Sequence, residues 1–216
     1  MAVSAYAERY RSWRWQAFRW RHELSTVQKI GLALGMAGIT GLFAQIRIPL
    51  WFTDVPITGQ VLPVLASGVL LGAAYGALGQ ALYLVLGACG VPWFQGWHSG
   101  VAYLTSPAFP TMGYLAGFIL AAFLSGKLTE KYIAARRFYA QLGLMLVGVA
   151  IIYVCGATYY AAVRHTGFGE TMVRAVLPFI PLDIAKAAAV AGISTALLPK
   201  TSYSDEVDRA EHLDGR

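Results

Sequence analysis

Residues 60–91, QVLPVLASGVLLGAAYGALGQALYLVLGACGV, decide the fold of this 216-residue chain. The stretch is 32 residues long and contains no charged side chain. A membrane-spanning helix needs about 20 apolar residues, so the stretch is too long for one span and too short for two full ones. We therefore expect two short helices that meet near Gly72.

Short helices leave part of the bilayer depth to be filled by other segments. Irregular backbone is tolerated at that depth only where it is buried in protein or lines an aqueous cavity. One flanking loop runs from the end of the first span to about Gly59. The other, residues 92–110, is rich in aromatic residues, Gly, Ser and Pro, and no residue in it except His98 can be charged near neutral pH. We expect both loops to fold inward.

Charge and hydropathy place the rest of the chain in a bilayer as well. Hydrophobic residues make up 57% of the sequence and charged residues 13%, with a mean hydropathy of +0.54, which is not the balance of a soluble domain. Further spans are expected at residues 27–46, 111–125, 140–163 and 181–198. The predicted fold class is an all-α membrane protein with six transmembrane helices.

The ends of the chain differ from this apolar centre. Residues 1–26 alternate arginines with Trp, Tyr and Phe, which predicts a cytoplasmic amphipathic helix in the headgroup layer. Residues 27–198 form the six-helix domain, and residues 199–216 are predicted to be a disordered cytoplasmic tail. Basic residues concentrate in the N-terminal segment and in residues 126–139, so both termini should be cytoplasmic. The same distribution marks membrane topology and not a nucleic-acid-binding face.

Asp183 and Lys186 are the most informative ionisable residues. They lie at the start of the otherwise apolar last span and, at i and i+3, share one helix face. A charged residue inside a span is costly and is commonly functional. One interpretation is a mutual ion pair with a structural role. The other is a ligand clamp, in which Lys186 receives a carboxylate and Asp183 accepts N–H donors.

Four segments together resemble the BioY family, the biotin-binding S components of energy-coupling-factor (ECF) transporters. They are AQIRIPLWFTDVPITGQVLPVLASGVLLG, YLVLGACGVPWFQG, PTMGYLAGF and LPFIPLDIAKAA, within residues 31–196. The resemblance implies a six-helix bundle of S-component type, with a biotin pocket near the outer face closed by the first and third loops. It also implies that Asp183 binds the ureido ring and Lys186 the valerate carboxylate.

The resemblance extends to further candidate binding residues. Thr58, Gln60 and Tyr83 match family positions, although each is equally typical of a cap or an interhelical hydrogen bond. The third loop is expected to add a polar contact near Phe94 and Gln95. Trp51, Phe52, Trp93 and Phe94 are candidates for an apolar wall, with Trp51 better suited to the interfacial aromatic belt. The third loop departs from the family pattern at Trp97, His98, Ser99, Phe109 and Met112.

Small residues on the first span suggest a surface for a partner. Gly31 and Gly35 are four residues apart, as are Ala33 and Ala37, and this spacing lets another helix approach closely. In the family, a related motif docks the S component onto a transmembrane coupling subunit. Packing within the bundle explains the same residues equally well.

Several other activities have little support in the sequence. There is no phosphate-binding loop of the G-x-x-x-x-G-K-[ST] type, so we expect partner subunits to use the ATP and this chain to hold no cofactor. The four histidines lack metal-ligand spacing, so no metal site is predicted. A different vitamin as ligand is one alternative. A small intramembrane hydrolase using Ser99, His98 or Asp183 is the other, although adjacent side chains seldom face each other.

Overall fold

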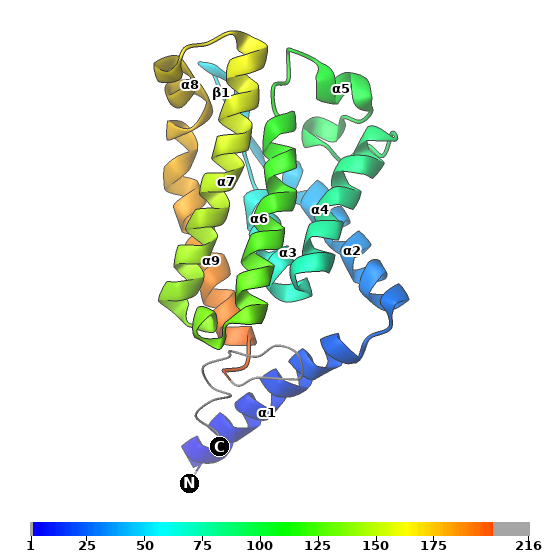
Figure 1. The fold of residues 1–216 in the computed structure, drawn as a ribbon, viewed down its shortest axis with the longest axis vertical. Coiled ribbons are helices and arrows are strands. Elements are labelled where there is room, and N and C mark those ends of the chain that lie inside the picture. The colour runs from blue at the N-terminus through cyan, green and yellow to red at the C-terminus, as the bar shows by residue number, and fades with distance from the viewer. Residues whose placement is uncertain (1, 201–216) are drawn as a thin grey trace.

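The computed structural model describes residues 2–200, with the side chains of residue 6 and residues 8–200. Helices make up most of it, and one β-hairpin interrupts them (Figure 1). The elements in chain order are α1 (Ala2–Glu23), α2 (Thr26–Ala44), β1 (Arg47–Leu50), β2 (Thr53–Thr58), α3 (Val61–Leu71), α4 (Ala73–Ala88), η1 (Gln95–Trp97), α5 (Val101–Thr105), α6 (Met112–Lys131), η2 (Ile133–Arg136), α7 (Phe138–Arg164), α8 (Phe168–Ala175), η3 (Leu177–Phe179) and α9 (Ile180–Leu197).

The predicted break at Gly72 is present and separates α3 from α4. Gly72 has φ +85°, which is unfavourable for any residue with a Cβ atom. An added Cβ would lie 1.9 Å from a Glu130 carboxylate oxygen, and that same oxygen accepts a hydrogen bond from the Ala73 amide at 3.0 Å. The chain can therefore turn sharply while α6 caps the new helix.

Within residues 2–200, four segments are long and apolar enough to cross a membrane, while α3 and α4 are shorter apolar helices. The four are Thr26–Ala44, Met112–Lys131, Phe138–Arg164 and Phe168–Leu197, the last of which joins α8, η3 and α9. Helix α6 extends to Lys131, beyond the predicted end at residue 125, because Gly126 and Thr129 are buried on its inner face. Lys127, which limits the hydropathy, projects from the exposed face of the same turn.

The first loop holds an element that the all-α prediction did not include. Strands β1 and β2 form an antiparallel hairpin with Arg47 opposite Thr58 and Ile48 opposite Ile57. The register shifts between Ile48 and Leu50, where Pro49 lacks the N–H that a regular ladder requires. Helix α8 is a second addition, in a region expected to be a loop.

Close helix packing builds the centre of the bundle. A Cβ on Gly76 of α4 would lie 2.6 Å from the Gly68 Cα of α3, so these two backbones are almost in contact. Helix α6 packs against α3, α4 and α7, and α7 packs against α9. The core is formed mainly by aliphatic and aromatic side chains such as Leu65, Val69, Met145 and Ile152.

Helix α1 crosses one end of the bundle, opposite the end that carries the hairpin, α5 and α8 (Figure 1). Its Phe18 is buried, with the guanidinium groups of Arg21 and Arg136 over the ring at 4.7 and 4.9 Å. The Tyr10 hydroxyl donates to the Ala196 carbonyl at 2.6 Å, in the last turn of α9. The segment predicted at residues 1–26 contains this helix, and its location at the membrane interface stays a prediction. Of the tail predicted at residues 199–216, residues 201–216 lie outside the described residues.

Candidate functional site

A cavity lies between α3, α4, α6, α7 and α9, beneath β2 and the third loop. The room it leaves for the centres of water molecules is about 60 Å³, so the hairpin and the third loop close tightly over it. Its lining includes all seven side chains predicted to bind substrate, which are Thr58, Gln60, Tyr83, Phe94, Gln95, Asp183 and Lys186. Five segments, namely β2, the start of α3, α4, the third loop and α9, thus bring these residues to one place.

Asp183 and Lys186 form an ion pair in the wall of this cavity. The Lys186 Nζ donates to Asp183 Oδ1 at 2.7 Å and to the Thr58 carbonyl at 2.5 Å. Asp183 is 3% exposed and lies in the first turn of α9, where the helix dipole stabilises a carboxylate. The ammonium group therefore links the last helix to the hairpin.

Tyr153 completes the environment of the carboxylate and was not predicted. Its hydroxyl, on α7, donates to Asp183 Oδ2 at 2.7 Å, so each carboxylate oxygen has a partner. A tyrosine hydroxyl inside an apolar helix requires a hydrogen-bond partner, and this was the available signal in the sequence. The ion pair and Tyr153 together make a polar patch in a mostly apolar cavity.

A second polar group joins the hairpin to α4. Thr58 donates to the Gln60 Oε1 at 3.0 Å, and the Gln60 amide donates to the Tyr83 hydroxyl at 2.9 Å. Tyr83 in turn donates to the Trp93 carbonyl at 3.2 Å. Because these groups satisfy one another, their geometry favours a positioning role for the hairpin and the third loop.

The third loop folds inward, as predicted. Phe94 and Gln95 are buried in the cavity wall, and the Phe94 ring packs edge-on against Tyr83 with centroids 5.5 Å apart. Gln45, at the end of α2, anchors this loop by donating to the Phe94 carbonyl at 3.0 Å and accepting from the Trp97 amide at 3.1 Å. Of the proposed aromatic wall, only Phe94 lines the cavity, and Trp51 is 96% exposed.

Two of the residues that depart from the family pattern, His98 and Phe109, form an aromatic cluster with Tyr103. The His98 ring stacks on Tyr103 with centroids 4.8 Å apart, and Tyr103 lies 4.8 Å from Phe109. The Tyr103 hydroxyl is buried and lines the cavity, near the side chains of Gln95 and Thr111. Burial raises the pKa of Tyr103, so the phenol stays protonated and can donate to a ligand.

The small residues of α2 divide between two faces. Ala33 and Ala37 are fully buried, and the Ala33 carbonyl lies against Gly79 of α4. These two alanines therefore belong to packing within the bundle in this structure, which was one of the two interpretations. Gly31 and Gly35 are exposed, with open space where a Cβ would be.

The described part of the chain offers no grouping of side chains for metal binding or for hydrolysis. Residues 2–200 contain no group of three His, Cys, Asp or Glu side chains that could hold a metal ion. The imidazole of His98 is held in the aromatic cluster with Tyr103 and Phe109, which does not direct it toward Ser99 as a general base.

The chain is similar in sequence to proteins of one family. A sequence model of the BioY family matches residues 16–202. The "Biotin transporter BioY" of Rhizobium etli is 36% identical over 81% of this chain and 95% of its own length. The "Probable biotin transporter BioY" of Methanothermobacter thermautotrophicus is 40% identical over 66% of this chain and 93% of its own.

A solved structure shares the fold. It is described as the S-component for biotin from an ECF-type ABC transporter, and it superposes with a TM-score of 0.72. The match covers 81% of this chain and 94% of that one, at 24% sequence identity.

Proposed function

This chain belongs to the BioY family, and from that premise we propose that it binds biotin in the Asp183–Lys186 cavity as the S component of an ECF-type transporter. The curated relatives are biotin transporters, so the chain is a transport protein and not an enzyme. Its apolar helices agree with a location in the membrane.

The observation that carries the proposal is the buried ion pair beside an open, largely apolar cavity. Biotin has a cyclic urea with two N–H donors at one end and a carboxylate on an alkyl chain at the other. Asp183 can accept a ureido N–H, and the Lys186 ammonium can exchange an existing acceptor for the biotin carboxylate. The apolar walls from Leu115, Phe118 and Ile152 suit the thiolane ring and the alkyl chain.

The two loops supply a cover for the bound ligand. Lys186 already contacts the hairpin through the Thr58 carbonyl, and Asp54 of the hairpin forms an ion pair with Arg164 at the end of α7. Entry of biotin therefore requires the hairpin to move away from α7 and α9 and then return. Tyr103, whose buried hydroxyl lines the cavity, adds a donor from the third loop.

Transport needs work that ligand binding alone does not provide, because a site that only binds cannot accumulate its ligand. We place that work in a transmembrane coupling subunit and ATPase subunits of an ECF module. The exposed Gly31 and Gly35 on α2 offer the close-approach surface for the coupling subunit. Both termini would be cytoplasmic, with α1 at the cytoplasmic membrane surface and the cavity facing outward.

Binding of radiolabelled biotin to the purified protein tests the proposal. We expect saturable binding that is lost in Asp183→Asn and in Lys186→Ala. Lys131→Ala is a matched control, since Lys131 is an exposed cation at the far end of α6. An absence of biotin binding in folded wild-type protein would refute the proposal.

A second ligand class is favoured by one observation, the aromatic cluster of His98, Tyr103 and Phe109 in the third loop. This cluster reshapes the cover of the cavity at positions that depart from the family pattern. A panel of other vitamins competing against labelled biotin decides between the ligands. Displacement by another vitamin at a lower concentration than unlabelled biotin would reassign the site.

A further inference from the structure

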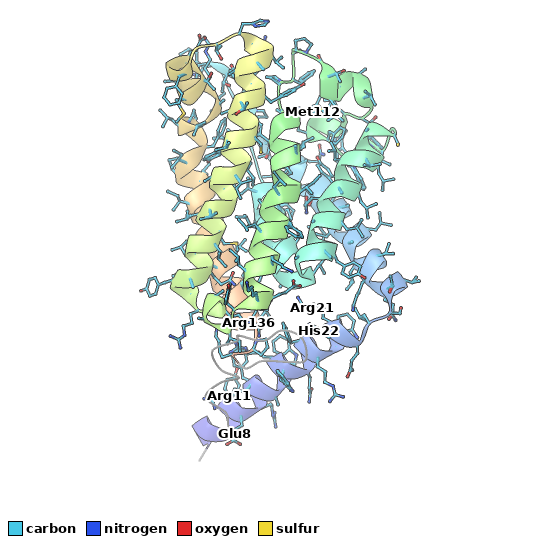
Figure 2. All side chains as sticks on the ribbon, viewed as in Figure 1. Glu8, Arg11, Arg21, His22, Met112 and Arg136 are labelled. Atoms are coloured by element: carbon cyan, nitrogen blue, oxygen red, sulfur yellow. The ribbon has the colours of Figure 1, made fainter. Side chains whose placement is uncertain are left out.

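A second cavity lies at the α1 end of the bundle, far from the site of Asp183 and Lys186. It leaves about 290 Å³ of room for the centres of water molecules, and it is bounded by the end of α1, the first turns of α2 and α4 and the last turns of α6. Its ionisable lining residues are Arg21, His22, Lys29, Lys127 and Glu130, and none of these lines the first cavity. Figure 2 shows Arg21 and His22 on α1, next to the end of the bundle.

The charge of this cavity is positive. With His22 neutral, three cations and one carboxylate line it. Two of these side chains, Arg21 and Glu130, form hydrogen bonds with the backbone where α3 meets α4. Arg21 donates to the Leu70 carbonyl at 3.1 Å, and Glu130 accepts from the Ala73 amide at 3.0 Å. The remaining positive charge belongs to the two lysines.

Both lysines can still donate hydrogen bonds. The Lys29 Nζ donates to the His22 carbonyl at 3.0 Å, which uses one of the three N–H groups of an ammonium. Lys127 is exposed and makes no hydrogen bond or ion pair with the described part of the chain. The first turn of α4, with Ala74 and Tyr75 in the lining, adds the positive end of a helix dipole.

The other walls of the cavity are apolar. Leu32, Tyr75 and Phe123 line it, and Phe123 is 47% exposed, so the apolar surface continues outward. Leu120, one turn earlier on α6, is 53% exposed. Two cations beside an apolar surface at the end of a membrane bundle match an amphiphile with an anionic head and a hydrocarbon tail.

We propose that this cavity binds an anionic phospholipid, with its phosphate on Lys29 and Lys127 and an acyl chain along Tyr75 and Phe123. A dissolved phosphate shares the chemistry of the head but gains nothing from the apolar wall. The bound lipid contacts both α2 and α6, and it fills the space beside the turn between α1 and α2. This site is independent of any ligand at Asp183.

Native mass spectrometry of the purified full chain, titrated separately with phosphatidylglycerol, phosphatidylcholine and inorganic phosphate, tests the proposal. We expect phosphatidylglycerol to bind at a concentration at least about tenfold lower than phosphatidylcholine or phosphate. Each lysine near a charged headgroup should contribute about fivefold in affinity. Lys127→Gln alone should therefore weaken phosphatidylglycerol binding about fivefold, and Lys29→Gln with Lys127→Gln more strongly.

The matched control is Lys131→Gln with Arg137→Gln, which removes the same charge from the same end outside the cavity. We expect it to bind phosphatidylglycerol within twofold of the wild type. Lys127 is exposed and unpaired in the described chain, so its single variant is decisive even if the Lys29 variant folds poorly. Equal losses in both double variants, or equal binding of inorganic phosphate or phosphatidylcholine, would overturn the proposal.

Discussion

The two ends of the bundle bury charged side chains in different ways. At the loop end, Asp183 and Lys186 pair with each other beside a cavity that they line. At the α1 end, Arg136 is fully buried and donates to the backbone carbonyls of Thr129 and Pro199 at 3.2 and 3.4 Å. Figure 2 places Arg136 at the end of the bundle beside α1.

The difference separates a binding site from a structural anchor. Arg136 is held by main-chain oxygens and by the Phe18 ring, and it lines neither of the two cavities described above. Lys186 has one side-chain partner and one main-chain partner, and both face an open volume. Arg136 is the more deeply buried of the two cations, but only Lys186 can exchange one of its partners for a ligand.

The largest effect should come from Lys186→Met. Removing one member of a buried ion pair leaves Asp183 uncompensated and should lower stability by about 3 kcal/mol. Adding Asp183→Asn to this variant should restore much of the stability, since no buried charge is then left alone. Neither variant should bind biotin. Thermal unfolding and labelled-biotin binding measure the two effects, and recovery of binding in the double variant would contradict the assignment.

Arg136→Met should lower stability without lowering biotin affinity. It removes two hydrogen bonds from a charged donor and a cation–π contact, so we expect a loss of stability of about 2 kcal/mol. The biotin affinity of the folded protein should stay within twofold of the wild type, because Arg136 lies at the other end. Arg137→Met, at an exposed neighbouring position, is the control and should leave stability unchanged. A marked loss of biotin affinity would mean that the two ends are coupled.

Tyr153→Phe tests whether the Tyr153 hydroxyl positions Asp183 for the ligand. It removes the hydroxyl that holds Asp183 Oδ2 while keeping the ring, so biotin affinity should fall about tenfold, as for a hydrogen bond to a charged group. Tyr139→Phe, whose side chain is exposed, is the control. Unchanged affinity in Tyr153→Phe would show that the carboxylate is positioned by Lys186 alone.

The ion pair of Asp54 and Arg164 should have a smaller effect. Both side chains are partly exposed, so the pair should contribute about 0.5 kcal/mol and weaken in high salt. Because it ties the hairpin to α7, Asp54→Asn should speed biotin dissociation about twofold. A double-mutant cycle with Arg164→Gln isolates the coupling, which should vanish if the hairpin is not the cover.

The sequence predicted the parts of this molecule that depend on local pattern. The break at Gly72 and the separation of Asp183 and Lys186 by one helical turn follow from spacing alone. Hydropathy could not find the end of α6, because Lys127 points outward while Gly126 and Thr129 remain buried. The sequence did not predict the hairpin, because strands of four and six residues show little periodicity.

Side-chain partners across the bundle were harder to predict than the helices. Tyr153 meets Asp183 from 30 positions away, and Gln45 reaches the third loop from 52 positions away at Trp97. Nothing in the local pattern of α7 or α2 indicates these partners, since they depend on how the helices pack. The sequence thus identified the charged pair but not the groups that orient it.

The smallest effect concerns Lys200, near Arg136, because its side chain is largely exposed and solvent screens its interactions. Burial, together with the positive charges of Arg14, Arg136 and Arg137, lowers the pKa of Lys200 from 10.5 to about 8. Between pH 8 and 10.5 the unfolded chain therefore holds more protons on this lysine than the folded chain, so the lysine makes stability rise with pH in that range. Lys200→Gln should flatten this rise in the unfolding temperature, whereas Lys131→Gln should keep it. High salt should also reduce it, because part of the shift comes from repulsion between cations. An identical pH profile for Lys200→Gln and the wild type would show that the cluster around Arg136 leaves Lys200 unperturbed.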